Sequence, residues 1–543
     1  MKIGTRGSEL ALWQARHVRA LLQEAAGVEC ELVVIKTSGD RDLDTPFVGM
    51  EGKGFFTKEI EDALLAHQID IAVHSLKDLQ TIMPDGLMLG AVPERADRRD
   101  VLLIRPDAFD RSLPLRIKSG AKVGTSSARR VAQLRFLRPD LDVEPLRGNV
   151  PTRVRKLSLG RYDAILAAAA GLDRLELSLD QFNVYRLPEM LVLPAPGQGA
   201  LGIQIRADDP VARDLIARLD HPEIREIVAI EREVLRLLEG GCQLALGTAA
   251  EKTPSGVRLA AFLGNDDFAH PRHVVIGGKD KDNVVSTCVS YLRGEKRLAG
   301  RTANVWITRE PQRAGSFVEP LERRAQVTAV PTFLAVEAGD RALQHVYLGR
   351  LASYDWVFFT SRVTVHEFAR LLREHKVQFG AATRIAAVGA KTASAVHDAG
   401  WRVDFIADVP DASALAEQFG QEHKGLIGKV LFPCGQAASK ELEGGLPDGV
   451  SQFDRMVCYD MARHPELNSV VAGLADPEAI AFTSPQAARF LLSARPLSAV
   501  TVPVSIGQAT TEALLQLGCP IVYETLDRSL EGLAEVINGL LAA

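Results

Sequence analysis

The segment Ile69–Asp78 reads IDIAVHSLKD and joins a short apolar run to a group of polar residues. The run Ile69–Val73 predicts a buried strand, and Lys77 and Asp78 follow at its end. A lysine and an aspartate at the exit of a strand face a cleft together, where the lysine neutralises an anion and the aspartate moves a proton. The alternative is an ordinary ion pair on the solvent-exposed surface, so further motifs are needed to distinguish the two interpretations.

Strand-like runs alternate with helical patterns along the whole chain. Examples are Glu31–Ile35, Ala121–Val123 and Asp163–Leu166, each flanked by longer amphipathic segments. This alternation predicts an α/β fold with largely parallel sheets. The polar stretch Arg293–Asn304 lacks a core pattern and precedes a new strand that starts at Val305, so we place the main domain boundary there.

Length and composition restrict the class of protein. The chain has 543 residues, of which 46% are hydrophobic and 24% charged, and a globular chain of this length has about three to five domains. Its 6 cysteines are scattered without C-x-x-C spacing, so we expect neither a disulfide scaffold nor a metal site. We find no secretory signal and no apolar run of the roughly 18 residues that span a bilayer, and we expect a cytoplasmic protein.

Positive charge is concentrated between Arg95 and Arg161. This segment holds 14 Arg and 3 Lys against 7 acidic residues, although the whole chain has a net charge of −5. Such a patch favours an anionic ligand. Only Phe109 and Phe136 are aromatic there, so the stacking surface of a protein that binds single-stranded nucleic acid is missing. Small polyanions are therefore favoured over nucleic acid.

Three other predicted strand ends carry residue types that bind anions. They are Thr5–Ser8 (TRGS), Gly124–Arg130 (GTSSARR), and Arg147–Asn149 (RGN) with Arg153. Free backbone amides, hydroxyls and guanidinium groups at the start of a helix form a site for carboxylate or phosphate. The alternative is a set of capped helices with solvated arginines, but several similar edges in one chain favour a site.

Two loops combine glycines with a basic or a thiol side chain. Gly52-Lys53-Gly54, followed by Lys58, predicts a flexible basic loop, and it does not match the phosphate-binding loop of nucleotide hydrolases. The segment Leu238–Gln243 (LEGGCQ) ends an amphipathic helix with two glycines and places Cys242 on a tight turn. Glycine is an ordinary helix C-cap, whereas a cysteine on an open loop is alternatively reactive or carries a covalent group.

The C-terminal part contains an internal repeat. Val357–Ser361 (VFFTS) and Ile480–Ser484 (IAFTS) both predict a strand that ends in Thr-Ser before a helix, and Gly389–Gly400 and Gly507–Gly518 share the pattern G-x-x-T-x-x-A-[VL]-x-x-x-G. Two copies of one α/β unit are implied. Amides and hydroxyls at the carboxyl ends of strands hold carboxylates, so a ligand cleft between the copies is favoured over duplication for stability alone.

The motifs taken together resemble a known family. Over residues 1–297 the chain resembles porphobilinogen deaminase, also called hydroxymethylbilane synthase, through TRGSELALWQA (Thr5–Ala15), GKGFFTKE (Gly52–Glu59), AVHSLKD (Ala72–Asp78), GTSSARR, LRGNVPTR (Leu146–Arg153), PAPGQGALG (Pro194–Gly202) and LEGGCQ. Residues 301–543, with their paired elements, resemble uroporphyrinogen-III synthase. Because these families catalyse consecutive steps, the chain resembles a fusion of the two.

The resemblance implies an α/β fold throughout. It implies a three-domain deaminase, with two periplasmic-binding-protein-like α/β domains and a small α+β domain, followed by a two-lobed α/β synthase with parallel sheets. We expect deaminase domain 1 at 1–93 with 194–216, domain 2 at 99–190 and the cofactor-carrying domain 3 at 220–297. We expect one synthase lobe at 302–334 with 463–543 and the other at 335–462.

The resemblance also assigns roles in the deaminase part. Cys242 matches the cysteine that carries a dipyrromethane cofactor through a thioether, and Asp78 matches the acid/base that assists loss of ammonia from porphobilinogen. Lys53 and Lys58 match residues of a mobile loop over the cleft. The residues that match those holding the acetate and propionate groups of cofactor and substrate are Arg6, Ser8, Gln14, Lys77, Ser127, Arg129, Arg130, Arg147 and Arg153.

In the synthase part the resemblance assigns fewer residues. Ser361, Thr392, Ser484 and Thr510 match positions at the ligand cleft, and Tyr459 matches a tyrosine that is proposed to assist loss of the substrate hydroxyl. A buried structural tyrosine is the alternative for Tyr459. The implied activity is condensation of four porphobilinogen molecules into hydroxymethylbilane, followed by closure with inversion of ring D to uroporphyrinogen III.

Alternatives and departures remain. An active deaminase with a silent C-terminal half, or a non-catalytic two-lobed anion-binding protein, would share many of these features. The family usually has Val-Pro or Leu-Pro after the Lys-Asp pair, but this chain has Leu79-Gln80, and Arg98 replaces a usual proline. Loss of a proline frees the turn beside Asp78. We expect a monomer that binds small molecules and neither nucleic acid nor membrane.

Overall fold

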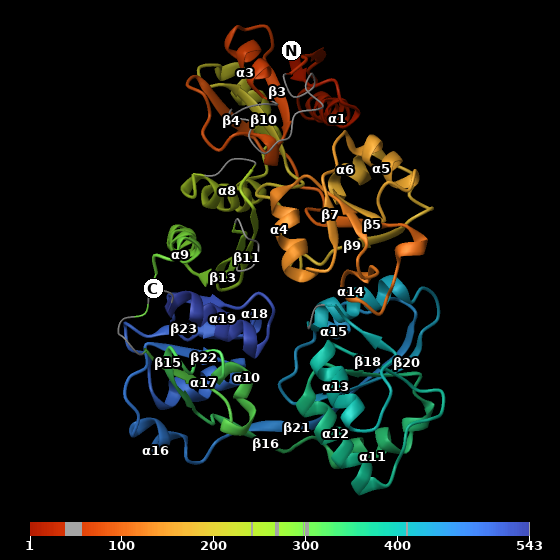
Figure 1. Cartoon of the computed structure of the whole chain (residues 1–543), viewed down its shortest axis with the longest axis vertical. Helices are drawn as coiled ribbons and strands as arrows, with labels where there is room; N and C mark the ends of the chain where they lie inside the picture. Colours follow the sequence, from red (N-terminus) through yellow and green to blue (C-terminus); the bar gives the residue numbers. More distant parts are fainter. Residues whose placement is uncertain are drawn as a thin grey trace. The chain divides into compact units, whose positions relative to one another are not determined.

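The chain folds into two compact units (Figure 1). The computed structural model describes residues 1–37, 57–239, 243–265, 271–296, 298, 303–408 and 411–541. Unit 1 contains Met1–Leu298 together with two C-terminal segments, Gly518–Leu526 and Val536–Ala543, whereas unit 2 contains Ala299–Leu517 and Asp527–Glu535. The C-terminal end of the chain therefore contributes to both units.

The first sheet of unit 1 combines N-terminal strands with one returning strand. Its order is β2 (Glu31–Val34), β1 (Lys2–Thr5), β3 (Ile71–Ser75), β10 (Leu201–Arg206) and β4 (Leu87–Ala91). β1 is parallel to β2 and β3, whereas β10 is antiparallel to β3 and β4. Helices α1 (Glu9–Ala26), α3 (Lys58–Leu65) and α7 (Pro210–Ile216) pack on this sheet. α1 ends at Gly27, whose φ of 66° favours glycine.

The second sheet of unit 1 gathers three helix starts at one edge. Its order is β7 (Asp142–Glu144), β6 (Lys122–Gly124), β8 (Ala164–Ala168), β5 (Asp100–Ile104) and β9 (Asn183–Arg186). β6, β7 and β8 are parallel, and β5 is antiparallel to β8 and β9. Helices α4 (Ala128–Leu137), α5 (Val150–Ser158) and α6 (Ala169–Leu175) each follow one of the parallel strands. Because parallel strands share one carboxyl edge, the N-termini of these helices lie there together.

The remaining strands of unit 1 are antiparallel. β11 (Leu246–Thr253), β12 (Gly256–Leu263), β13 (Arg272–Gly278) and the C-terminal strand β24 (Ile521–Glu524) pair in that order. Helix α8 (Pro222–Leu237) packs against β11, and α9 (Lys281–Arg293) packs against α8, β12 and β13. Helix α19 (Leu530–Leu541) follows β24, and its residues from Val536 onward belong to unit 1.

Unit 2 contains two groups of strands with their helices. The first group has the order β23 (Val502–Ser505), β22 (Ala479–Phe482), β14 (Ala303–Ile307) and β15 (Ala325–Ala329), with helices α10 (Gly315–Val318), α16 (Leu467–Ala472), α17 (Pro485–Ala494) and α18 (Gln508–Gln516). The second group has the order β16 (Phe333–Glu337), β21 (Val450–Arg463), β20 (Gly428–Gly435), β17 (Trp356–Phe359), β18 (Arg384–Ala387) and β19 (Phe405–Ile406). Its helices are α11 (Arg341–Gly349), α12 (Arg362–His375), α13 (Ala390–Asp398), α14 (Ala412–Glu422) and α15 (Glu441–Gly444).

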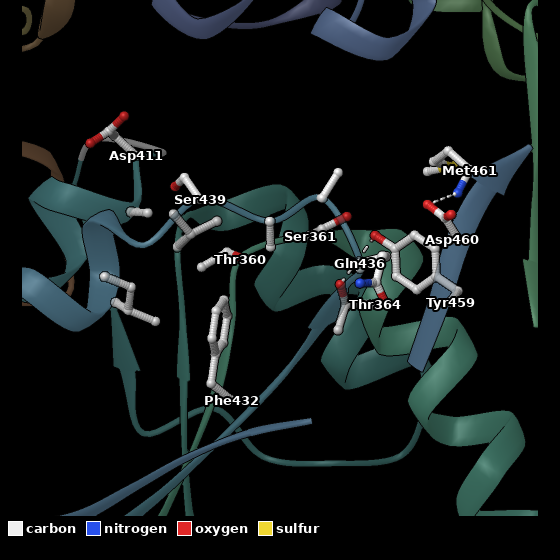
Figure 2. A pocket seen from close by; sticks show the side chains of 16 residues that line it. Thr360, Ser361, Thr364, Asp411, Phe432, Gln436, Ser439, Tyr459, Asp460 and Met461 are labelled. Carbon is white, nitrogen blue, oxygen red and sulfur yellow. Dashed lines mark hydrogen bonds between the residues drawn. The ribbon is translucent and has the colours of Figure 1, made fainter. Parts of the chain in front are cut away.

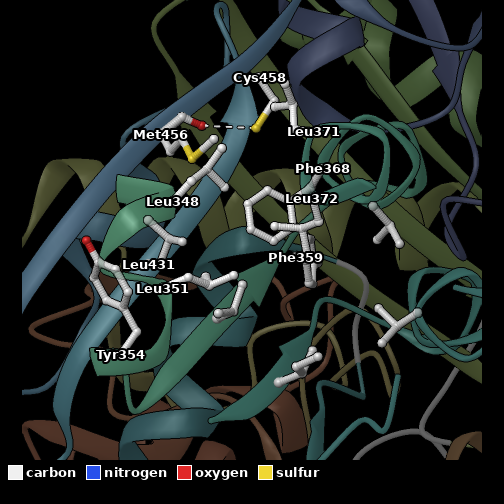
Figure 3. Close-up of a cluster of buried hydrophobic side chains, with 14 of the residues drawn as sticks. Leu348, Leu351, Tyr354, Phe359, Phe368, Leu371, Leu372, Leu431, Met456 and Cys458 are labelled. Atoms are coloured by element: carbon white, nitrogen blue, oxygen red, sulfur yellow. Dashed lines mark hydrogen bonds between the residues drawn. The ribbon is translucent and has the colours of Figure 1, made fainter. Parts of the chain in front are cut away.

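Apolar side chains are buried on both faces of the six-stranded sheet of unit 2. Figure 3 shows one of these clusters, in which Phe359 of β17 lies beside Phe368 and Leu372 of α12. The opposite face buries Trp356 and Phe358 against α14. Consecutive residues of a strand point to opposite faces, so the uninterrupted apolar run of β17 is what a strand covered on both sides requires.

The predicted α/β class is confirmed, but the sheets are mixed rather than largely parallel. The runs predicted as strands at Glu31–Ile35, Ala121–Val123 and Asp163–Leu166 correspond to β2, β6 and β8. The antiparallel members β5 and β10 enter their sheets from the opposite end. The hydrophobic pattern of a strand indicates whether it is buried but not in which direction it runs. The sequence therefore did not distinguish the antiparallel strands from the parallel ones. No helix in the described part of the chain has the length and apolar character that crossing a membrane requires.

Candidate functional site

The turn that carries Lys77 and Asp78 follows β3 directly. A single 3-10 turn over Leu76–Asp78 buries Leu76 and leaves the Asp78 side chain exposed. Arg232 of α8 donates hydrogen bonds to the carbonyl oxygens of Leu76 and Leu79 at 2.8 and 2.9 Å. It also donates to the carbonyl oxygen of Gln80 at 2.6 Å. One guanidinium therefore holds the turn at Leu79-Gln80, where the resemblance leads us to expect a proline that this chain lacks.

Lys77 is half-buried beside this turn. Its Nζ lies 3.5 Å from Oε1 of Gln198, in the segment between the second sheet and β10. Burial lowers the pKa of Lys77 to about 8, although the neighbouring Asp78 acts in the opposite direction. A lysine held in this way binds an anion readily, because an added negative charge favours its protonated form.

Arg129 and Arg130, at the start of α4, share one buried carboxylate. Nη1 of Arg129 and Nη2 of Arg130 each lie 2.7 Å from an oxygen of Asp100, which is fully buried at the start of β5. Burial opposes ionisation of Asp100, yet the two arginines hold its pKa well below the usual range. The two guanidiniums thus bind an internal carboxylate in addition to any ligand.

One pocket of unit 1 collects several of the predicted residues. The polar side chains that line it are Gln14, Ser75, Lys77, Arg130, Arg153 and Arg174. Gln14 donates to the hydroxyl of Ser75 at 2.8 Å, which fixes both side chains. Burial lowers the pKa of Arg153 to about 10, and the charge of Arg130 acts in the same direction. Four cationic side chains around one pocket make it a site for a ligand with several negative charges.

Arg174 was not among the residues predicted from the sequence. It lies in α6, donates to the carbonyl oxygen of Gly199 at 2.9 Å and is stacked over Trp13 at 5.5 Å from the ring centroid. The segment GLDRL around it has no motif that distinguishes it from a helix surface. The sequence analysis also did not single out Gln198, in the segment Pro194–Gly202, which contacts Lys77. It did not single out Asp100, which binds Arg129 and Arg130.

The other residues predicted for the deaminase part are placed outside this pocket. None of the following described residues lines it: Arg6 after β1, Ser8 at the N-cap of α1, Lys58 at the first residue of α3, Asp78 on the turn after β3, Ser127 before α4, Arg129 in the first turn of α4 and Arg147 after β7. The hydroxyl of Ser8 accepts the amide of Ala11 at 3.3 Å, which is a capping contact. Lys53 and Cys242 lie outside the described residues, so their roles stay predictions.

A second pocket, of about 340 Å³, lies in unit 2 at the ends of β17, β20 and β21 (Figure 2). Ser361 and Tyr459 line it together with Thr364 and Gln436. Figure 2 shows the Tyr459 hydroxyl directed toward Thr364, whose Oγ1 lies 3.4 Å away. Burial raises the pKa of Tyr459, while hydrogen bonds with Thr364 and Ser361 act against this. Tyr459 is therefore a neutral hydroxyl at physiological pH.

The two copies of the internal repeat have the same local backbone. Gly389 and Gly507 have φ/ψ of 168°/173° and 169°/173°, and each precedes a helix. Thr392 and Thr510 are buried in the first turns of these helices, at 6% and 2% exposure. The hydroxyl of Ser484 caps α17 by accepting the amide of Ala487 at 3.1 Å. Within the described residues, Thr392, Ser484 and Thr510 do not line the pocket around Tyr459.

Arg309 is a further residue that sequence reasoning missed in unit 2. It follows β14, and burial together with the charges of Arg362 and Arg313 lowers its pKa to about 10. Its buried Nε has no hydrogen-bond partner among the described residues. No group of three or more His, Cys, Asp or Glu in the described ranges is placed to hold a metal ion.

Comparison with known proteins agrees with the geometry of unit 1. Residues 1–214 match the family model described as porphobilinogen deaminase, dipyromethane cofactor binding domain. The chain is 46% identical over 268 residues to the porphobilinogen deaminase of Syntrophobacter fumaroxidans, covering 49% of this chain and 85% of that protein. It is 46% identical over 305 residues to that of Sulfurimonas denitrificans, covering 55% of this chain and 96% of that protein. The chain belongs to the porphobilinogen deaminase family.

A second family matches a later region of the chain, most of which lies in unit 2. Residues 317–535 match the family model described as uroporphyrinogen-III synthase HemD. Among solved structures, a mutant uroporphyrinogen III synthase from Thermus thermophilus is 18% identical, with a TM-score of 0.31, and the match covers 40% of this chain and 90% of that one. The synthase from Helicobacter pylori is 17% identical, with a TM-score of 0.30, and the match covers 44% and 99%. The family match carries the assignment, and it confirms the predicted fusion of a deaminase and a synthase domain.

Proposed function

We propose that the deaminase domain condenses four porphobilinogen molecules into hydroxymethylbilane with release of ammonia. The observation that carries this proposal is the pocket in which Lys77, Arg130, Arg153 and Arg174 gather beside the turn of Asp78. Each pyrrole unit of the substrate brings two carboxylates, so the growing chain gathers negative charge. Guanidinium groups bind carboxylates through two parallel hydrogen bonds, which agrees with a pocket lined mainly by arginine.

The charge of the same pocket suits a dipyrromethane cofactor. The family match to residues 1–214 is to the domain that binds this cofactor, and the cationic side chains suit a group with four carboxylates. We propose Cys242 as its attachment point, through a thioether. When bound, the cofactor supplies the pyrrole end to which the substrate units are joined. Lys77, Arg130 and Arg153 hold its carboxylates, and we assign Arg6, Ser8, Gln14, Ser127, Arg129 and Arg147 to the carboxylates of cofactor and substrate.

Asp78 is proposed as the catalytic acid/base. Its side chain is exposed on the turn after β3, whereas Leu76 before it is buried and anchors the turn. We propose that this carboxylate holds a proton at the leaving amino group and stabilises positive charge that develops on the pyrrole. Lys53 and Lys58 are proposed to close over the substrate from their loop.

The synthase domain is proposed to convert hydroxymethylbilane into uroporphyrinogen III with inversion of ring D. The pocket with Ser361 and Tyr459 supports this, because it offers hydroxyls and an amide but few charged groups. Tyr459, as a neutral hydroxyl, assists departure of the substrate hydroxyl by hydrogen bonding. Thr392, Ser484 and Thr510 are proposed to bind the substrate, and positioning rather than a strong acid supplies much of the rate.

Intact mass and product analysis of the full chain test the whole proposal. We expect the added mass of one dipyrromethane on the purified protein, its absence in Cys242→Ala, and mainly isomer III after incubation with porphobilinogen. Cys30→Ala is the matched control, since it removes a half-buried thiol and keeps the adduct. The adduct with isomer I alone would mean a silent synthase domain. No adduct in protein produced with porphobilinogen available would favour a non-catalytic anion-binding protein.

The finer organisation stays a prediction. We propose that the deaminase comprises two periplasmic-binding-protein-like domains and a small α+β domain, and that the synthase comprises two lobes. The alternating helices and strands around two separate five-stranded sheets in unit 1 support the first part of this proposal. The monomeric state and the cytoplasmic location also stay predictions.

A further inference from the structure

The pocket around Tyr459 has no cation in its wall. Asp411 and Asp460 line it, and its described lining residues include no lysine, arginine or histidine. Figure 2 shows Asp411 at the opposite end of the pocket from Tyr459. The substrate proposed for the synthase domain carries two carboxylates on each pyrrole unit, and two aspartates in the wall repel such an anion. Its binding therefore calls for a cationic side chain from outside this lining.

Arg528 supplies a cation at the Asp411 end of the pocket. Its Nη1 donates to Oδ2 of Asp411, and both residues belong to unit 2. The side chain of Arg528 is only 15% exposed. Its Nε is buried and has no hydrogen-bond partner among the described residues. Because a guanidinium presents a fork of donors that matches a carboxylate, the contact with Asp411 leaves the donors of Arg528 incompletely used.

The backbone presents Arg528 from a fixed turn. Its φ of 54° lies in the left-handed region, which residues other than glycine seldom adopt. The carboxylate of Asp527 accepts the amide of Ser529 at 3.0 Å, and the Ser529 hydroxyl accepts the amide of Gly532 at 2.9 Å in the first turn of α19. These contacts hold the residues on both sides of Arg528. Backbone strain persists where the surroundings impose it, and it is common at ligand sites.

The stem of the Arg528 side chain lies against the turn that begins α18. A Cβ added at Gly507 would lie 3.5 Å from Cγ and 3.7 Å from Nε of Arg528. Helix α18 carries Thr510, which is proposed to bind the substrate but does not line the pocket around Tyr459. Arg528 therefore extends from the start of the Thr510 helix to the Asp411 end of this pocket.

Asp411 does not depend on Arg528 alone. Its Oδ1 accepts the amides of Ser413 and Ala414 at 2.9 and 3.2 Å, at the start of α14. A carboxylate at a helix N-terminus is stabilised by these amides and by the helix dipole. The side chain of Asp411 is also 26% exposed. Asp411 therefore keeps partners for its charge when Arg528 binds another carboxylate.

We propose that Arg528 binds a carboxylate of the synthase substrate, which replaces the carboxylate of Asp411 on the guanidinium. The ligand is a polycarboxylate, and one ion pair is exchanged for another. The bound carboxylate lies at the end of the pocket away from Tyr459, on a part of the substrate that does not react. Arg528 thus contributes to binding and not to bond breaking. This inference rests on the proposed synthase activity.

Steady-state kinetics of the full chain with hydroxymethylbilane test the proposal. Arg528→Gln should raise KM for uroporphyrinogen III formation by roughly 10- to 100-fold, because a charged hydrogen-bond donor is lost. It should leave kcat nearly unchanged, since the contact is equal in ground and transition states. Arg528→Lys keeps the charge without the fork, so its KM should rise less. Lys391→Gln, which removes an exposed cation paired with Glu531 outside the pocket, is the matched control with normal KM.

Variants of Asp411 separate binding from two structural roles. Asp411→Asn keeps the oxygen that caps α14 and removes the competing charge, so KM should fall by about two- to fivefold. In the double variant with Arg528→Gln, KM should stay at least about tenfold above that of Asp411→Asn. A double variant with the KM of Asp411→Asn would overturn the proposal, because Arg528 would then only neutralise Asp411. Equal losses in the two single variants would overturn it as well, because the ion pair would then only hold the structure.

The wild-type chain distinguishes failure of this inference from failure of the proposed function. A wild type that forms no uroporphyrinogen III from hydroxymethylbilane would overturn both. Formation of uroporphyrinogen III by the wild type, with an unchanged KM in Arg528→Gln, would overturn the role of Arg528 alone. Consumption of porphobilinogen by the deaminase domain should be normal in every variant, which checks that the chain is intact. If Arg528→Gln does not fold, Arg528→Lys carries the test with an expected rise in KM of about threefold.

Discussion

Arg232 Nη1 lies 2.8 Å from the carbonyl oxygen of Leu76, so helix α8 holds the turn that carries Asp78. The same guanidinium reaches the carbonyl oxygens of Leu79 and Gln80. Arg232 itself is 8% exposed, which makes these contacts strong and their loss costly. The residue does not line the pocket of unit 1, and we regard it as a positioning residue for Asp78.

Arg232→Leu should therefore reduce kcat and leave the dipyrromethane adduct in place. Loss of three charge-assisted hydrogen bonds frees the turn, and a misplaced catalytic group lowers the rate by about 10- to 100-fold. The rate of porphobilinogen consumption and the intact mass measure the two effects. Arg236→Leu, on an exposed position of the same helix, is the control. An unchanged kcat in Arg232→Leu would show that the turn holds its position without this contact.

Asp78→Asn should abolish tetrapyrrole formation while the cofactor remains attached. The amide keeps the shape of the side chain but neither holds a proton for the leaving amino group nor carries a negative charge, and loss of a general acid/base costs about 10²- to 10⁴-fold. Single-turnover assays with porphobilinogen measure this loss. Asp85→Asn alters another exposed carboxylate of the same domain and should have normal activity. Normal turnover of Asp78→Asn would remove the residue from the mechanism.

The pH dependence of kcat/KM should reflect Lys77. A lysine is charged below its pKa, so Lys77 contributes its positive charge up to about pH 8 and loses it as the pH rises further. Since kcat/KM reports ionisations of the free enzyme, it should fall on the alkaline side near that value. Lys77→Arg keeps the charge to higher pH and should move the fall upward. Lys279→Arg, at an exposed position, should leave the profile unchanged.

Tyr459 and Thr364 should act as a coupled pair in the second step. Their hydroxyls lie 3.4 Å apart in the pocket of unit 2. Tyr459→Phe and Thr364→Val should each slow closure of hydroxymethylbilane by about 10-fold. The double variant should lose little more activity, because each single change already removes the contact between the two hydroxyls that orients them. The rate of uroporphyrinogen III formation from hydroxymethylbilane measures this. Strictly additive losses would show that the two hydroxyls act separately.

Thr510→Val should impair ring inversion or closure without affecting the first step. The threonine is buried in the first turn of α18, and valine has a similar shape without the hydroxyl. We expect a lower fraction of isomer III at unchanged porphobilinogen consumption. Thr328→Val, on the half-buried strand β15, serves as the control. An unchanged isomer ratio and rate would remove Thr510 from the site.

Much of the pocket in unit 1 was predictable from strand ends. Lys77, Arg130 and Arg153 all follow predicted strand ends, Gln14 was expected from the family resemblance, and the structure brings all four to one pocket. Arg174 and Arg232 were not predictable in this way, because they lie inside helices without a motif and act on segments that are distant in sequence. Sequence spacing describes neighbours along one element, whereas these contacts depend on how separate elements pack.

The repeat in unit 2 illustrates the same limit. The matching patterns around Gly389 and Gly507 predicted equivalent helices, and the structure gives both glycines the same backbone conformation. The pocket itself, however, depends on Gln436 after β20 and on Thr364 inside α12, which no repeat marks. A repeat identifies equivalent positions, but it does not show which of them border a cavity.

The arrangement of Arg129 and Arg130 around Asp100 has a consequence for affinity. Long, flexible side chains ordinarily lose conformational freedom when a ligand arrives, at roughly 0.5–1.5 kcal/mol for each one immobilised. Here the internal carboxylate already restrains both guanidiniums during folding. A carboxylate ligand that binds at this edge would therefore lose less side-chain entropy on Arg129 and Arg130 than on free arginines, because Asp100 already holds both guanidiniums in place.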